Sequence, residues 1–202
     1  MRIGMLGAGQ VAQAIAGHAV AAGHQVVLSN RRGPATLKPV IERLGALASA
    51  GTPAEAADAD LVILAVWWTD VPEAIAATGI SDWKGRIVID ATNQFVSPPP
   101  NAQVADLGDV TGSEHIASML PGARVVKAFN ALYGAYIAAD PRHPAGRQIL
   151  VLAGDDPDAR HTVAELAEEF GFAAVDLGGL RDGGRLMQLG GPLSALHALK
   201  QD

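Results

Sequence analysis

The sequence predicts an α/β fold: a doubly wound, mostly parallel sheet with helices on both faces. Two observations support this prediction. Short apolar runs alternate with segments of helical periodicity along the chain. One of these runs, residues 61–66, is apolar throughout, which is typical of a strand buried on both faces of a parallel sheet. With 202 residues, 49% of them hydrophobic, the chain suits a single domain, which we place over 1–202.

In the first half of the chain, glycines separate strands from helices. Residues 2–6 form an apolar run that ends in glycines, and a helical pattern follows until Gly23. Gly45 ends a second helix in the same way, since glycine readily adopts the backbone conformation found at helix C-termini. The expected strands cover 2–6, 25–28, 46–48, 61–66 and 86–90, and the expected helices cover 10–22, 34–44, 53–57 and 71–78.

In the second half, a loop around Pro98–Pro100 interrupts the alternation, because proline lacks the amide donor that a helix or central strand needs. Thr111 with Glu114 resembles a capping box at a helix start. Asp155 or Asp156 is expected to cap a later helix. We expect a loop over 93–108, helices over 111–119 and 157–170, strands over 124–129, 148–153 and 173–177, and a short C-terminal helical segment over about 180–202 with a break at 190–192.

Composition excludes several classes of function. A formal net charge of −6 argues against a protein that binds nucleic-acid phosphates. The absence of cysteine rules out disulfides, thiolate metal sites and cysteine nucleophiles. The histidines show no zinc-ligand spacing, so no metal site is expected. The six histidines are His18, His24, His115, His143, His161 and His197.

The longest uninterrupted apolar run, residues 61–68, is far shorter than the about 20 residues that a bilayer helix requires. The N-terminal residues are small and apolar, as in a signal peptide, but Gly4, Gly7 and Gly9 interrupt them. We therefore expect a cytoplasmic protein that does not engage a membrane.

The strongest motif follows the first expected strand. Gly7-Ala8-Gly9-Gln10-Val11-Ala12 matches the pattern GxGxxA and lies between a strand and a helix. In such a turn the first glycine permits the tight bend, the second lets backbone amides approach a pyrophosphate, and the small third residue lets the helix pack on the strand. The pattern predicts a Rossmann-type dinucleotide site; the alternative is a glycine-rich turn that binds no nucleotide.

The end of the second strand indicates which dinucleotide is bound. NAD-binding folds usually place an Asp or Glu there to hold the ribose hydroxyls. This chain has Ser29, Asn30, Arg31 and Arg32 instead. Guanidinium groups can bind a 2′-phosphate through paired hydrogen bonds, so the residues predict NADP(H). The alternative is that the arginines belong to an ordinary solvated turn, more plausibly for Arg32 than for Arg31.

Several further segments complete a family resemblance. They are the GAGQVA turn, Ser29–Arg32, Val125–Asn130 with its KAFN sequence, Ala153–Asp156, and Val175–Gly178. Together they resemble the coenzyme F420-dependent NADP oxidoreductases over about residues 2–199. The resemblance implies a compact Rossmann domain with a small C-terminal helical part, which transfers hydride between NADP(H) and a deazaflavin. A similar domain forms the reductase part of membrane ferric reductases, where the acceptor is a flavin.

The resemblance also assigns roles to residues. It places Gly7, Ala8, Gly9, Gln10 and Val11 at the pyrophosphate, and Asn30 with Arg31 at the 2′-phosphate. Ala65, Val66 and Trp67 would lie along the nicotinamide, with Ala91 and Thr92 at the next strand end. Asn130, Ala131 and Leu132, in the stretch 130–134, would face the acceptor ring.

We expect no catalytic acid or base, because hydride transfer between two cofactors depends mainly on how they are positioned. Trp67 or Trp68 could shield the rings from water, or both could serve only core packing. Asp90, at a strand end, is interpreted as a loop anchor in preference to a functional acid.

Two rival interpretations remain open. One is an NADPH-dependent reductase of a flavin or a small carbonyl or imine substrate, although the few residues after the last strand leave no room for the helical substrate domain common in such enzymes. The other is a non-catalytic NADP(H)-sensing domain. We also expect a homodimer, in which the apolar side of residues 186–199 meets a second subunit and completes the acceptor pocket.

Overall fold

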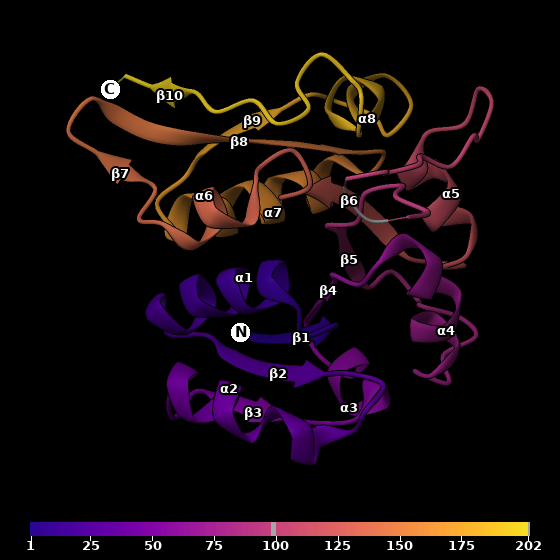
Figure 1. The fold of residues 1–202 in the computed structure, drawn as a ribbon, viewed down its shortest axis with the longest axis vertical. Coiled ribbons are helices and arrows are strands. Elements are labelled where there is room, and N and C mark those ends of the chain that lie inside the picture. Colours follow the sequence, from indigo (N-terminus) through magenta and orange to yellow (C-terminus); the bar gives the residue numbers. More distant parts are fainter. Residues whose placement is uncertain (98–99, 202) are drawn as a thin grey trace.

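The computed structural model describes residues 1–97 and 100–201. Parallel strands form the centre of one sheet in the order β3-β2-β1-β4-β5-β6, which is the doubly wound arrangement that the sequence predicts (Figure 1). These strands are β1 (Arg2–Leu6), β2 (Gln25–Ser29), β3 (Ala48–Ala50), β4 (Leu61–Leu64), β5 (Ile87–Asp90) and β6 (Arg124–Ala128). Because they are parallel, their carboxyl ends share one edge of the sheet, where open α/β sheets bind ligands.

The sheet continues past β6 with a change of direction. Strand β8 (Gly146–Gly154) pairs antiparallel with β6, and β9 (Ala173–Asp176) pairs parallel with β8. The short strands β7 (Arg142–His143) and β10 (Leu199–Lys200) both pair antiparallel with the start of β8. The sheet is therefore mostly parallel, with an antiparallel extension built around β8.

Helices cover both faces of the sheet, each burying its apolar side against alternate residues of the strands. On one face, α1 (Gln10–Ala21), α2 (Lys38–Leu44), α6 (Gly134–Ala138) and α7 (Pro157–Glu169) pack on residues such as Met5 and Ile63. On the other face, α3 (Pro53–Ala57), α4 (Val71–Ala76) and α5 (Gly112–Ser118) pack on residues such as Val62 and Val88. Neighbouring residues on β4 thus serve opposite layers, which explains why this run is apolar throughout.

The predicted capping residues are confirmed in two cases. Thr111 begins α5 with a full capping box, in which its side chain accepts a hydrogen bond from the Glu114 amide and the Glu114 side chain accepts from the Thr111 amide. Asp156, and not Asp155, caps α7 by accepting from the Ala159 amide. Asp155 instead accepts from the backbone amide of Leu180 and ties the chain after β9 to the end of β8.

The chain differs from the sequence prediction in several places. The third strand lies at Ala48–Ala50, two residues later than expected, and the helix expected over 34–44 is divided into a 3₁₀ turn, η1 (Pro34–Leu37), and α2. Helix α6 follows the KAFN segment, where none was expected. The expected loop over 93–108 is present and closes through a bridge between Phe95 and Val104, while Pro98 and Pro99 lie outside the described residues.

The C-terminal segment is only partly helical, so the expected helical tail is wrong beyond residue 187. Helix α8 (Asp182–Met187) is followed by turns and by the strand β10. Gly190, Gly191 and Pro192 interrupt the helix, and the antiparallel pairing of Leu199 and Lys200 with β8 provides the backbone partners that a helix would otherwise supply. Over the residues described, no helix is long and apolar enough to cross a membrane.

Candidate functional site

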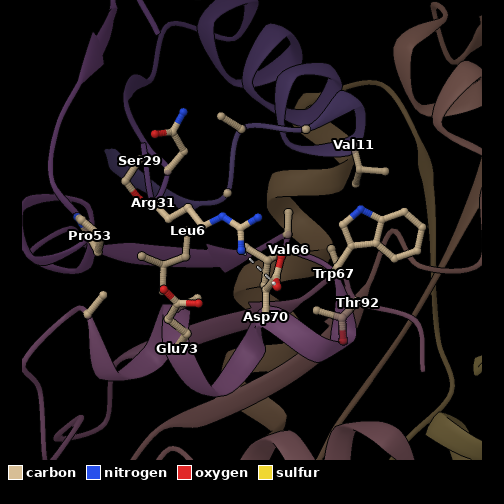
Figure 2. Close-up of a pocket in the computed structure, with 18 of the residues that line it drawn as sticks. Leu6, Val11, Ser29, Arg31, Pro53, Val66, Trp67, Asp70, Glu73 and Thr92 are labelled. Carbon is tan, nitrogen blue, oxygen red and sulfur yellow. Dashed lines mark ion pairs between the residues drawn. The ribbon is translucent and has the colours of Figure 1, made fainter. Parts of the chain in front are cut away.

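A cavity of about 790 Å³ opens at the carboxyl ends of the parallel strands (Figure 2). All fourteen residues predicted to bind the cofactor line it: Gly7, Ala8, Gly9, Gln10, Val11, Ser29, Asn30, Arg31, Arg32, Ala65, Val66, Trp67, Ala91 and Thr92. Gln10 and Val11 come from the first turn of α1, and the others from the ends of β1, β2, β4 and β5, which are neighbours in the sheet. The volume falls within the range of about 300–1,000 Å³ typical of cofactor and ligand sites.

The glycine turn has the geometry that the motif requires. Gly7 has φ +115°, and a Cβ added there would lie 2.2 Å from the carbonyl oxygen of Ala65, so no other residue fits. A Cβ at Gly9 would meet no described atom within 4 Å, which leaves the backbone open toward the cavity. Ala12, at the third small position, is fully buried where α1 packs on the sheet. The three positions therefore have the backbone conformation, open space and burial that the pattern requires.

The N-terminus of α1 is arranged to receive an anion. Its N-cap residue Gly9 supplies no side-chain hydrogen bond, and its first turn contains no acidic residue. By contrast, Thr52, Thr111 and Asp156 cap α3, α5 and α7 with their own oxygen atoms. An uncapped helix N-terminus that faces a cavity offers free amides and a partial positive charge to a phosphate. The glycine turn and α1 thus fit the pyrophosphate of a dinucleotide.

At the end of β2, the four predicted residues differ in whether their side chains are held by hydrogen bonds. The Ser29 hydroxyl is buried and donates to the carbonyl oxygen of Met5 at 2.8 Å, so it serves the fold. The Asn30 side chain donates to Thr36 at 3.0 Å and accepts from the Arg32 amide at 3.0 Å, which fixes the turn. Arg31 and Arg32 are exposed and line the cavity, and the Arg31 guanidinium extends toward Asp70 (Figure 2). The two arginines are therefore the positive charges available to a 2′-phosphate.

Two acidic residues of the same cavity were missed by sequence reasoning. Asp70 ends the 3₁₀ turn η2 (Trp68–Asp70), and Glu73 lies in α4; both line the cavity across from Arg31 (Figure 2). Arg31 Nη1 lies 3.6 Å from Asp70 Oδ1. No sequence pattern indicates this contact, because acids at the start of a helix are common for reasons of helix stability alone.

Beneath the opposite end of the cavity lies a buried ion pair. The ammonium of Lys127 on β6 lies 3.1 Å from Asp90 Oδ2, and the two side chains are 1% and 0% exposed. Lys127 also donates to the carbonyl oxygen of Thr92 at 3.1 Å. Asp90 accepts from the Ser113 hydroxyl and from both the amide and the hydroxyl of Thr92. This network fixes the chain directly after β5, so the structure supports the loop-anchor interpretation of Asp90.

The electrostatics of this network favour charged Asp90. Burial raises the pKa of its carboxyl group, but the Lys127 ammonium and the hydrogen bonds from Ser113 and Thr92 outweigh burial and hold the pKa below its ordinary value. The anchor therefore carries a carboxylate at neutral pH. Thr92, whose backbone and hydroxyl it holds, lines the cavity.

The two tryptophans have different environments. Trp67 lines the cavity and its residue is 52% exposed, so its ring is available to a bound ligand (Figure 2). Trp68 packs against the core on the α3, α4 and α5 face, with its ring centroid 5.5 Å from that of His115. The shielding role thus fits Trp67, and the packing role fits Trp68.

The residues predicted to face the acceptor lie deeper than expected. Asn130, Ala131 and Leu132 are buried and are not among the residues that line the cavity. The Asn130 side chain donates to the carbonyl oxygen of Met187 at 2.8 Å, and its own backbone carbonyl accepts from Asn93 at 2.9 Å. Asn93 does line the cavity, so this stretch supports the cavity wall from behind.

The turn after β6 is backbone-strained. Phe129 has φ +65°, a left-handed conformation that is rare for an aromatic residue, yet it is buried and packs edge-on against Phe172 with ring centroids 6.1 Å apart. This conformation turns the chain so that Asn130 reaches Asn93 and Met187. Such strain persists where surrounding packing imposes it, often near functional sites.

No group of three or more His, Asp or Glu side chains placed to hold a metal ion occurs among the described residues. The buried His24 and the partly buried His18 have other partners. His18 Nε2 lies 2.5 Å from the carbonyl oxygen of Ile137, and His24 Nε2 lies 2.8 Å from a carboxylate oxygen of Glu169. Both connect helices of one face of the fold, away from the cavity residues.

Comparison with known proteins points to the same cofactor class. Residues 2–94 match the family model described as NADP oxidoreductase, coenzyme F420-dependent. The matched region ends at Gln94, so it includes all four strand ends that form the cavity.

Individual relatives extend the likeness over most of the chain. A hypothetical protein from Sinorhizobium meliloti is 41% identical, with a TM-score of 0.91 over 100% of this chain and 96% of its own. A protein from Arthrobacter sp. described as an F420-dependent NADP reductase is 25% identical, with a TM-score of 0.81 over 93% and 90% of the two chains.

Metalloreductase STEAP3 of Rattus norvegicus is 30% identical over 89% of this chain and 34% of its own length. The chain thus spans about a third of the length of that curated relative.

Proposed function

We propose that this chain, which carries a domain of the coenzyme F420-dependent NADP oxidoreductase family over residues 2–94, binds NADP(H) in the strand-end cavity and transfers hydride between the nicotinamide and a deazaflavin or flavin. The observation that carries the proposal is the combination, in one cavity, of an open glycine turn, an uncapped helix N-terminus and two exposed arginines. The fit of these groups to a phosphorylated dinucleotide does not depend on the acceptor.

The chain's own residues divide the binding task along the cavity. The turn Gly7–Gly9 and the first amides of α1 hold the pyrophosphate, and Arg31 and Arg32 hold the 2′-phosphate. Ala65 and Ala91 are small residues at the ends of β4 and β5, and they leave room for a flat ring beside them. Thr92, which donates two hydrogen bonds to Asp90, lines this end of the cavity.

The nicotinamide supplies the hydride chemistry when bound, and the protein contributes position and the exclusion of water. Strands β4 and β5 are buried neighbours in the centre of the sheet, so the ring would be held against a paired backbone. Trp67 covers the same end and can displace water from it. Positioning of this kind can lower a barrier by about 7–11 kcal/mol, so the proposed hydride transfer needs no acid or base from the protein.

The test is a steady-state assay of NADPH oxidation with coenzyme F420 as acceptor, in which turnover is measured as the loss of deazaflavin absorbance. We expect turnover with NADPH, and a raised KM for NADPH in Arg31→Ala with a smaller change in kcat. Riboflavin and FMN, each in place of coenzyme F420, test the flavin alternative in the same assay. Tight binding of NADPH without turnover on any of these acceptors would refute hydride transfer to a deazaflavin or flavin, and would favour a reductase of a small carbonyl or imine or an NADP(H) sensor.

We also propose that the protein is a homodimer. Large apolar side chains are exposed on the loop after β5 and on the C-terminal segment, namely Val96, Val104, Val110, Leu186 and Leu196. Exposed apolar groups of this kind are common at subunit interfaces. Sedimentation at micromolar concentration tests the proposal: a species of about twice the 20.8 kDa chain mass supports it, and a monomer contradicts it.

A further inference from the structure

Arg31 extends across the mouth of the cavity from the end of β2 toward the 3₁₀ turn after β4 (Figure 2). Its guanidinium meets Asp70, with Nη1 3.6 Å from Oδ1. The two side chains are 69% and 37% exposed, so the contact is loose and solvated. Both residues line the cavity, which means that the partner of Arg31 in this structure is part of the same binding site.

An arginine that is paired with a carboxylate is not equally available to a phosphate. To receive a 2′-phosphate through paired hydrogen bonds, the Arg31 guanidinium must turn away from Asp70 or share its donors with it. The Asp70 carboxylate would also repel the phosphate dianion in the same part of the cavity. Both effects oppose binding of NADP(H), while a cofactor without the 2′-phosphate is subject to neither.

We infer that Asp70 is a specificity-determining residue that competes with the 2′-phosphate for Arg31 and thereby reduces the preference of the site for NADP(H) over NAD(H). The inference rests on the proposed function of the cavity as an NADP(H) site. Because of this competition, the site prefers NADP(H) less strongly than it would if it had the two arginines and no Asp70. Asp70 therefore adjusts how strongly the protein distinguishes the two cofactors.

The structure allows this role to be separated from folding. Asp70 occupies the N-cap position of α4, but its side chain makes no capping hydrogen bond there. Asp70→Asn keeps the shape of the side chain and removes its charge, so it should preserve the fold. Glu73→Gln is a matched control, because Glu73 lines the same cavity and carries the same charge but is not the residue that pairs with Arg31.

The experiment is calorimetric titration of the full chain and its variants, in low-salt buffer, with NADPH, NADH and adenosine 2′,5′-bisphosphate. An exposed ion pair is worth little, so we expect Asp70→Asn to tighten NADPH and the bisphosphate by about two- to fivefold. We expect a smaller change for NADH. The gain should shrink as salt is added, because exposed charges are screened. Glu73→Gln should alter the NADPH/NADH ratio less than Asp70→Asn does.

A double-variant cycle identifies the pair. If Asp70 acts through Arg31, Asp70→Asn should give no comparable gain in the Arg31→Ala background. An equal gain in NADPH affinity in that background, or an equal gain from Glu73→Gln, would overturn the inference that Asp70 competes for Arg31. The inference would also be overturned if Asp70→Asn bound NADPH no more tightly than the wild type. If the wild-type chain binds neither NADPH nor the bisphosphate, the proposed function fails together with this inference. If it binds both and Asp70→Asn has no effect, only the inference fails.

Discussion

Replacing Lys127 with methionine tests the anchor beneath the cavity. The substitution keeps most of the volume of the side chain but removes the only ammonium near Asp90 that the described residues provide. Asp90 is fully buried, and the hydrogen bonds from Ser113 and Thr92 remain. A carboxylate left without its countercharge in the core is costly, because neither water nor a cation compensates it.

The expected loss is about 3–5 kcal/mol of unfolding free energy, the usual cost of removing one partner of a buried ion pair. For a chain of this length, 1 kcal/mol corresponds to about 2–4 °C, so the melting temperature should fall by about 6–20 °C. Urea denaturation followed by circular dichroism measures the free energy. The double variant Asp90→Asn/Lys127→Met should recover part of the loss, since it removes the charge that Lys127→Met leaves unpaired.

Two results would refute this reasoning. A loss below about 1 kcal/mol for Lys127→Met would mean that the pair behaves like an exposed one. A double variant no more stable than Lys127→Met would show that the cost does not come from the uncompensated carboxylate.

Three further predictions concern Asp90, Gly7 and Thr111. Because the pKa of Asp90 is lowered in the folded protein, its contribution to the free energy of unfolding is present above the ordinary carboxyl pKa of about 3.9 and is lost as pH falls below it. The wild type should therefore lose stability on acidification more steeply than Asp90→Asn does. Parallel profiles of stability against pH for the two proteins would contradict this. Gly7→Ala would place a Cβ 2.2 Å from the Ala65 oxygen, so we expect this variant to lose NADPH binding or to fail to fold. A variant with the stability and NADPH affinity of the wild type would contradict the role given to Gly7 in the turn. Thr111→Val removes the acceptor for the Glu114 amide and should cost about 0.5–2 kcal/mol in urea denaturation, whereas an unchanged midpoint would show that the cap is dispensable.

The features that the sequence predicts well are those fixed by local constraints. Gly7 can be assigned to the phosphate turn because its backbone conformation and its contact with Ala65 exclude any side chain. The apolar run of β4 identifies a strand because both of its faces are buried. The cavity residues follow from topology, since the carboxyl ends of neighbouring parallel strands must meet.

The features that were missed depend on contacts between distant parts of the chain. The ion pair of Arg31 with Asp70 joins two turns that only the sheet brings together. The pairing of Leu199 with Gln148 makes a strand of a segment expected to be helical. Asn130 is a buried polar residue that forms hydrogen bonds with Asn93 and Met187. These partners are distant in the sequence, so no hydrophobic periodicity predicts them.

A crystal structure of the protein with NADP⁺ tests directly whether the strand-end cavity binds the cofactor. We expect the pyrophosphate over the turn Gly7–Gly9, the 2′-phosphate at Arg31 or Arg32, and the nicotinamide beside Ala65 and Thr92. A dinucleotide bound in the reverse direction, or bound outside the strand-end cavity, would contradict this expectation.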